Sequence, residues 1–177
     1  MLGRTLKLIL ELSGRRPPTG QAADLFDELG RSAPPRPVAE VEDDIWDLWL
    51  HHRDQACTGC MNQAIAAMTM HRHDDALVLL SRIIVMAPDW PEAWNKRATL
   101  HFMAGLDAEA LADIGRTVIL EPRHFGAIAG FGHIALRHGD LPAAQAAFEA
   151  ALGIHPHLQD IRLLIHEIGR DLPHTVN

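Results

Sequence analysis

The amino-acid sequence predicts an all-α protein: a right-handed solenoid of three helix-turn-helix units, with N-terminal helices before it and a C-terminal capping helix behind it. The first observation is a set of residues that recurs every 34 positions, a spacing typical of helix-turn-helix repeats. The recurring residues are a proline (Pro88, Pro122, Pro156), an alanine (Ala76, Ala110, Ala144) and a large apolar residue (Leu80, Ile114, Phe148). The second observation is composition, because 47% hydrophobic and 22% charged residues among 177 are the balance of an ordinary globular domain.

Each recurring residue has a physical role in such a unit. Glycine at Gly105 and Gly139 ends the first helix, because glycine adopts a left-handed backbone at little cost. The alanine lets two antiparallel helices approach closely, and the proline stops the second helix. A single unit cannot bury its apolar face alone, so we expect the three units to stack.

The first segment, residues 1–37, is expected to hold an amphipathic helix, a short helix over 22–29 and the proline-rich linker SAPPRP. The apolar face of the amphipathic helix consists of Leu2, Leu6, Ile9 and Leu10. We interpret this helix as one that docks on the rest of the chain. A membrane-surface anchor, or the remnant of an export signal, is the alternative interpretation.

The next segment, residues 38–56, is predicted to be a tryptophan-containing helix that packs on the array. Its first turn is acidic, which suits a helix N-terminus because the N–H groups there carry partial positive charge. Its apolar face consists of Val41, Ile45, Leu48 and Trp49, with Trp46 beside them.

The repeats occupy residues 57–158, in units of 57–90, 91–124 and 125–158. Residues 159–177 follow as a capping helix and tail. The capping helix has a polar face and an apolar one, as the end of a solenoid requires. The apolar residues are Ile161, Leu164, Ile165 and Ile168.

The order of marker residues in the units resembles the tetratricopeptide-repeat (TPR) family. The family pattern runs from an early tryptophan through glycine, an aromatic residue, alanine, a large apolar residue and a second alanine to proline. Unit 125–158 follows it closely, and unit 91–124 opens with Trp94. Unit 57–90 is degenerate, because Cys60 stands at the tryptophan position. The stretches EDDIWDLWL, WNKRATL and LEPRHFGAIAG are similar to those of small bacterial TPR proteins of unassigned function, which are often exported.

This resemblance implies a protein–protein interaction module. In TPR proteins the first helices of successive units line a concave groove that binds a peptide or helix of a partner. Carried over by position, the partner-binding residues are Asn62, Asn95, Lys96, Thr99, Phe102, His133 and Arg137. The amides and cations in this set can pair with a peptide backbone and with carboxylates. The carboxylate clamp of chaperone-binding TPR domains is only partly matched.

Two other functions stay open. Cys57 and Cys60, three residues apart with histidines nearby, suggest a metal- or redox-responsive module. Two thiols fall short of the four ligands of a structural zinc site, and no predicted strand precedes them as in thioredoxin-like proteins. The other function is that of a self-associating structural subunit, joined through the helix that carries Trp46 and Trp49.

Composition and motifs argue against several classes. A net charge of -7 with only two lysines provides no basic face for nucleic acid. We expect no enzyme activity, cofactor or metal, because neither a catalytic triad nor a glycine-rich phosphate loop is visible. No apolar run reaches the roughly 18 residues of a membrane-spanning helix. The lack of a clear signal peptide favours the cytoplasm, whereas the exported relatives favour the periplasm.

Overall fold

The computed structural model describes residues 1–14 and 21–171, which form ten helices and no strand, so the predicted all-α class is confirmed. The helices are α1 (Leu2–Ser13), α2 (Gln21–Leu29), α3 (Val38–Leu50), α4 (Gln55–Thr69), α5 (His73–Met86), α6 (Pro91–Met103), α7 (Asp107–Leu120), α8 (Phe125–Arg137), α9 (Leu141–Ile154) and α10 (Gln159–Asp171). The predicted tail after residue 171 lies outside the described residues.

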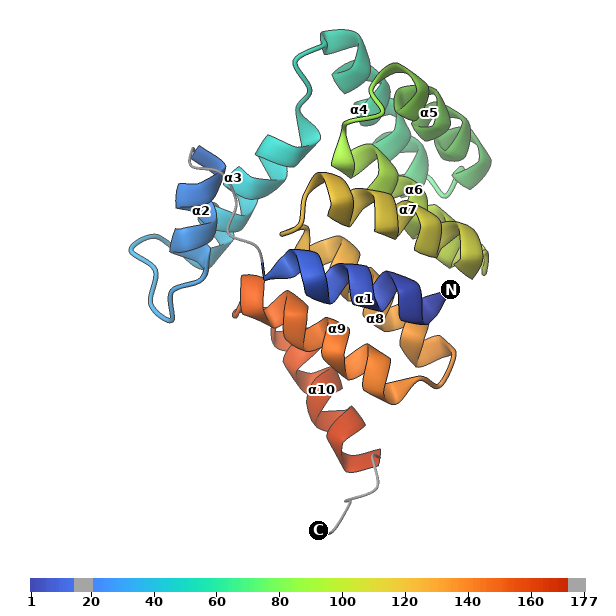
Figure 1. The fold of residues 1–177 in the computed structure, drawn as a ribbon. Helices are drawn as coiled ribbons and strands as arrows, with labels where there is room; N and C mark the ends of the chain where they lie inside the picture. The colour runs from blue at the N-terminus through green and yellow to red at the C-terminus, as the bar shows by residue number, and fades with distance from the viewer. Residues whose placement is uncertain (15–20, 172–177) are drawn as a thin grey trace.

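The repeats are built as three helix pairs, α4–α5, α6–α7 and α8–α9, whose partners pack closely against each other (Figure 1). The alanine of each second helix, Ala76, Ala110 or Ala144, is fully buried, as its role in close helix approach requires. The turn inside each pair has one residue with positive φ: His71 at 57°, Gly105 at 74° and Gly139 at 71°. The first unit therefore has a histidine where the other two units have glycine, the residue that adopts a positive φ without strain.

Helix α1 packs across α7 and α9, and Figure 1 shows it lying over these second helices. This is the arrangement that the docking interpretation expects. Thr5 and Ile9 are buried in the contact, and Gly115 of α7 lets Leu8 approach. Leu10 was expected on the apolar face but is 49% exposed. The reason is geometric, because successive residues are turned by about 100° around a helix and Leu10 follows the buried Ile9.

Helices α2 and α3 pack against each other as a hairpin at the edge where α6 and α8 begin. Arg36, between them, pairs with Glu28 of α2 and Asp44 of α3. The hairpin core contains Val41, Ile45 and Trp49 of α3, packed with Leu25, Phe26 and Leu29 of α2 and with Phe125 of α8. Leu48, predicted on the same apolar face, is instead 41% exposed, because the side chains of Ile45 and Trp49 take the inward positions.

Helix α10 closes the array against α9. Ile161 and Ile168 are buried and Leu164 and Ile165 half-buried, in keeping with the apolar face expected of a cap. None of the described helices is both long enough and apolar enough to cross a membrane.

Candidate functional site

A hollow of about 300 Å³ lies between α6 and α8, the first helices of the second and third units. Most of its wall is apolar, with Ala98 and Phe102 from α6, Ile134 from α8 and Ile114 from α7 behind them. The structure brings four of the seven predicted partner-binding residues to this hollow: Asn95, Thr99, Phe102 and His133.

The hollow stays open because α8 presents small residues to it. Gly126, Ala129 and Gly130 follow at helical spacing, so they share one face of the helix. A Cβ atom at Gly126 would lie 3.3 Å from Cη2 of Trp46, and one at Gly130 would lie 3.7 Å from Cδ1 of Ile114. Larger side chains at these positions would therefore fill the hollow.

A second hollow, of about 460 Å³, adjoins the first on the other side of α8. Its wall comes from α3, α8 and the start of α10, and it includes Trp46 and Asp160. The two hollows share Gly126, Ala129 and His133, so they form one continuous depression that we call the groove. The groove is thus lined by the first helices α6 and α8 and by α3 and α10, which lie outside the repeats.

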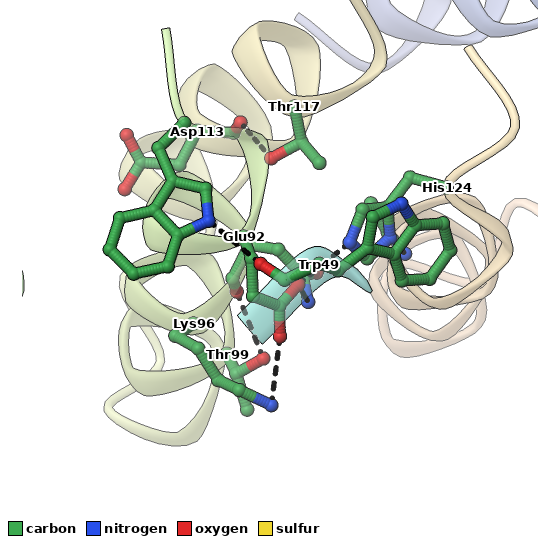
Figure 2. A network of polar contacts seen from close by, with 10 residues as sticks. Trp49, Glu92, Lys96, Thr99, Asp113, Thr117 and His124 are labelled. Carbon is green, nitrogen blue, oxygen red and sulfur yellow. Dashed lines mark hydrogen bonds and ion pairs between the residues drawn. The ribbon is translucent and has the colours of Figure 1, made fainter. Parts of the chain in front are cut away.

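A buried polar network fixes the relative positions of α6 and α8 at one end of the groove (Figure 2). The carboxylate of Glu92 on α6 is fully buried and lies 2.7 Å from Nε2 of His124, the N-cap residue of α8. Nδ1 of His124 accepts a hydrogen bond from the backbone N–H of Ala127, so the ring proton on Nε2 is the one donated to Glu92. Asn95 donates a further hydrogen bond of 3.0 Å to Glu92.

This network keeps Glu92 ionised. Burial by itself raises the pKa of Glu92, but its hydrogen bond to His124 and the charge of Lys96 outweigh burial and lower the pKa below its ordinary value. A buried carboxylate held in this way is stable only while its partners stay in place. The contact between Glu92 and His124 therefore holds the second and third repeats in a fixed relative position.

Helix α3 covers the network from the outside. The indole ring of Trp49 stacks on the imidazole of His124 at a centroid distance of 4.1 Å and an angle of 8°. The backbone carbonyl of Trp49 accepts a hydrogen bond of 2.7 Å from the indole N–H of Trp90. Trp49 is only 4% exposed, so the self-association predicted through this helix would have to rely on Trp46 and Leu48 or to open the hairpin.

Lys96, predicted as a cation of the groove, forms an ion pair with a carboxylate of its own chain. Its ammonium group lies 3.0 Å from Oε1 of Glu92 and 5.4 Å from the ring centroid of Trp46. Lys96 lines neither hollow. Its charge balances that of the buried carboxylate and is therefore a structural charge.

Arg137, at the other end of α8, also forms an ion pair within the chain. Its guanidinium group pairs with both carboxylate oxygens of Asp107 and donates to the carbonyl oxygen of Phe102, at 2.9 Å. It also lies over the Phe102 ring, 3.9 Å from the centroid. The last predicted residue, Asn62, is exposed on α4 and lies outside both hollows.

Sequence reasoning missed the part of the groove that comes from outside the repeats. Glu42 and Trp46 of α3 and Asp160 of α10 line the second hollow, together with His155. The 34-residue pattern carries no information on these positions, because α3 precedes the repeats and α10 follows them. The tryptophan-rich helix was the only available signal.

Cys57 does not have the exposed surroundings of a reactive thiol. Cys57 is 1% exposed in the core of the first unit, and burial raises the pKa of its thiol, with Asp54 and Cys60 acting in the same direction. A raised pKa disfavours the thiolate that redox and metal chemistry need. Within residues 1–14 and 21–171, no three His, Cys, Asp or Glu side chains converge in a way that could hold a metal ion.

Comparisons with known proteins agree with this architecture. A sequence model described as a tetratricopeptide repeat matches residues 61–122. A TPR repeat-containing protein of Rhizobium etli is 32% identical over 139 residues, which cover 78% of this chain and 68% of the relative.

Solved TPR domains have the same fold at low sequence identity. The first TPR of Spaghetti (RPAP3), bound to the HSP90 peptide SRMEEVD, is 18% identical, with a TM-score of 0.63 over 68% of this chain and 96% of that one. The TPR2B domain of yeast Sti1, in complex with an Hsp70 peptide, is 14% identical, with a TM-score of 0.62 over 67% of this chain and all of that one. The Arabidopsis OM64 TPR domain is also 14% identical, with a TM-score of 0.63 over 67% of this chain and 98% of that one.

Three findings lead to one assignment: the helix pairs, the residues that recur every 34 positions, and the Rhizobium relative. Members of the family concerned are generally non-catalytic and serve as protein-binding modules. The chain belongs to the tetratricopeptide-repeat family.

Proposed function

We propose that this protein is an adaptor that binds an extended or helical segment of a partner protein in the groove along α6, α8 and α10. The observation that carries the proposal is the apolar hollow between α6 and α8, kept open by the small residues of α8. An apolar side chain of a partner that enters this hollow replaces water with Ala98, Phe102 and Ile134, and burial of one such side chain contributes about 1.5–3 kcal/mol.

The polar residues of the groove suit a peptide backbone. Asn95 and Thr99 on α6 and His133 on α8 border the first hollow and provide side-chain donors and acceptors. The solved TPR domains with bound HSP90 and Hsp70 peptides support a peptide as the ligand of this chain. The buried contact between Glu92 and His124 supports a groove that is already formed before the partner binds. A preformed groove lowers the entropic cost of binding.

The test fills the groove while leaving its surroundings intact. Ala129 is half-buried and borders both hollows, so Ala129→Leu inserts a large side chain with little change in helix propensity. The matched control is Ala112→Leu on the exposed face of α7. Immobilised wild type would select peptides from a displayed library of random 12-residue sequences, and both variants would be probed with the enriched peptides.

We expect enriched peptides to bind wild type and Ala112→Leu equally and to lose at least tenfold in affinity for Ala129→Leu. A library that yields no enriched peptide would overturn the proposed function, and so would peptides that bind Ala129→Leu as well as wild type. Circular dichroism and urea unfolding of both variants would verify that the fold is retained. Charge reversal of Lys96 or Arg137 is a poorer test, because it breaks the ion pairs with Glu92 and Asp107.

A further inference from the structure

The charges around the groove point to a particular class of partner. Three cations near the groove are each matched by a carboxylate of the same chain, and Arg162 of α10, beside the second hollow, donates to the carbonyl oxygen of Pro156. Lys96 pairs with the buried Glu92, and Arg137 pairs with Asp107. Arg97 binds Asp113 through two hydrogen bonds of 2.8 and 2.7 Å. An incoming carboxylate would have to displace a partner that is already in place.

The lining of the groove itself holds carboxylates and no cation. Neither hollow is lined by a lysine or an arginine of the described chain. The second hollow is lined by Glu42 and Asp160. Of its three histidines, His133 and His155 have pKa values lowered mainly by burial, and Nε2 of His157 lies 2.9 Å from the carbonyl oxygen of Arg31.

The two carboxylate side chains of the second hollow are partly or largely exposed. Glu42 is 3.0 Å from Nε2 of His155, but about a third of its side chain remains exposed. Asp160 is exposed in the first turn of α10 and has no ion pair or hydrogen bond with any side chain of the described residues. Trp46 lies in the same wall.

We infer that the partner segment is apolar and basic: a large apolar side chain enters the hollow between α6 and α8, and a lysine or arginine reaches Glu42 and Asp160 in the adjoining hollow. This inference rests on the proposed function and specifies its ligand. It differs from an acidic chain terminus, the ligand that a carboxylate clamp would take. The net charge of -7 of the whole chain favours the same partner through long-range attraction.

The experiment uses peptides enriched on the wild-type protein from the displayed 12-residue library, synthesised with a fluorescent label and measured by fluorescence anisotropy. Asp160→Asn removes one carboxylate of the second hollow without changing its shape. Asp74→Asn is the matched control, because Asp74 is also exposed in the first turn of a helix, at a site remote from the groove residues in sequence. We expect Asp160→Asn to raise Kd about two- to fivefold for peptides with a lysine or arginine, as for an exposed ion pair, and Asp74→Asn to leave it unchanged.

Replacing the basic residue of the peptide by glutamine should remove the difference between Asp160→Asn and wild type. Enriched peptides that are acidic or uncharged, yet are blocked by Ala129→Leu, would overturn this inference and leave the proposed function standing. Basic peptides with equal affinity for Asp160→Asn and wild type would also overturn it. The absence of any groove-dependent peptide would overturn both proposals together.

Discussion

Single residues set how closely the helices of a repeat can approach, and Gly132 is the clearest case. It lies on α8 facing the fully buried ring of Phe148 on α9. A Cβ atom at Gly132 would lie 2.3 Å from Cε1 of Phe148, far inside van der Waals contact. The large aromatic ring on α9 therefore requires a residue without a side chain opposite it on α8.

Gly132→Ala is expected to destabilise the protein by about 1–3 kcal/mol, because the buried ring cannot move away without disturbing its neighbours. The control is Gly59→Ala on α4, where an added Cβ would meet nothing within 4 Å. That change should stabilise the protein by about 0.5–1 kcal/mol through helix propensity. Urea unfolding followed by circular dichroism measures both, and equal effects of the two substitutions would contradict the packing argument.

At the scale of elements, the N-terminal helices outside the repeats are attached to the repeats by two different kinds of contact. Helix α1 is held on α7 and α9 by apolar contacts around Ile9 and Leu8. The α2–α3 hairpin is held by aromatic and polar contacts, including the stack of Trp49 on His124 and the contact of Glu42 with His155. Only the second attachment contributes walls to the groove, so it couples the hairpin to binding.

The attachment of α1 can be tested with adjacent residues. Ile9→Ala removes a fully buried side chain and should destabilise the protein by about 2–5 kcal/mol, whereas Leu10→Ala removes a half-exposed one and should cost less than about 1 kcal/mol. Hydrogen exchange of residues 2–13 should become faster in Ile9→Ala alone. Equal unfolding midpoints for the two variants would mean that α1 is not docked through the face described above.

For the whole molecule, titratable groups buried between elements make stability depend on pH. His155, fully buried between α9 and α10, has a pKa lowered by burial, partly offset by Glu42. Its neutral form is favoured in the folded state, so its contribution is present above an unfolded-state pKa of about 6.5 and is lost as pH falls below it. Glu92 has a lowered pKa, so its contribution is present above about pH 4.5 and is lost below that value.

The free energy of unfolding should therefore fall in two stages on acidification, the first as the pH falls below about 6.5 and the second below about 4.5. Urea midpoints measured at intervals from pH 8 to 3.5 would reveal both. His155→Gln should flatten the first stage, leaving the share of His133, whose pKa burial also lowers. Glu92→Gln should flatten the second stage. A profile that His155→Gln leaves unchanged would show that His155 carries no part of this dependence.

The sequence by itself determined the repeat architecture, because helical periodicity and turn chemistry are local and return every 34 residues. Proline, glycine and alanine at fixed positions imply helix ends and close approaches without knowledge of the fold. Four of the predicted site residues, Asn95, Thr99, Phe102 and His133, followed from that register and do line the first hollow.

Only the tertiary structure decided which side chains remain available. Lys96 and Arg137 look like free cations in the sequence, and their partners Glu92 and Asp107 become apparent only when the helices are packed. The second hollow joins Glu42, His133 and Asp160, the first and last of which are 118 residues apart in the sequence. The strength of a charge depends on its burial and its neighbours, and these are properties of the packed molecule that no local pattern encodes.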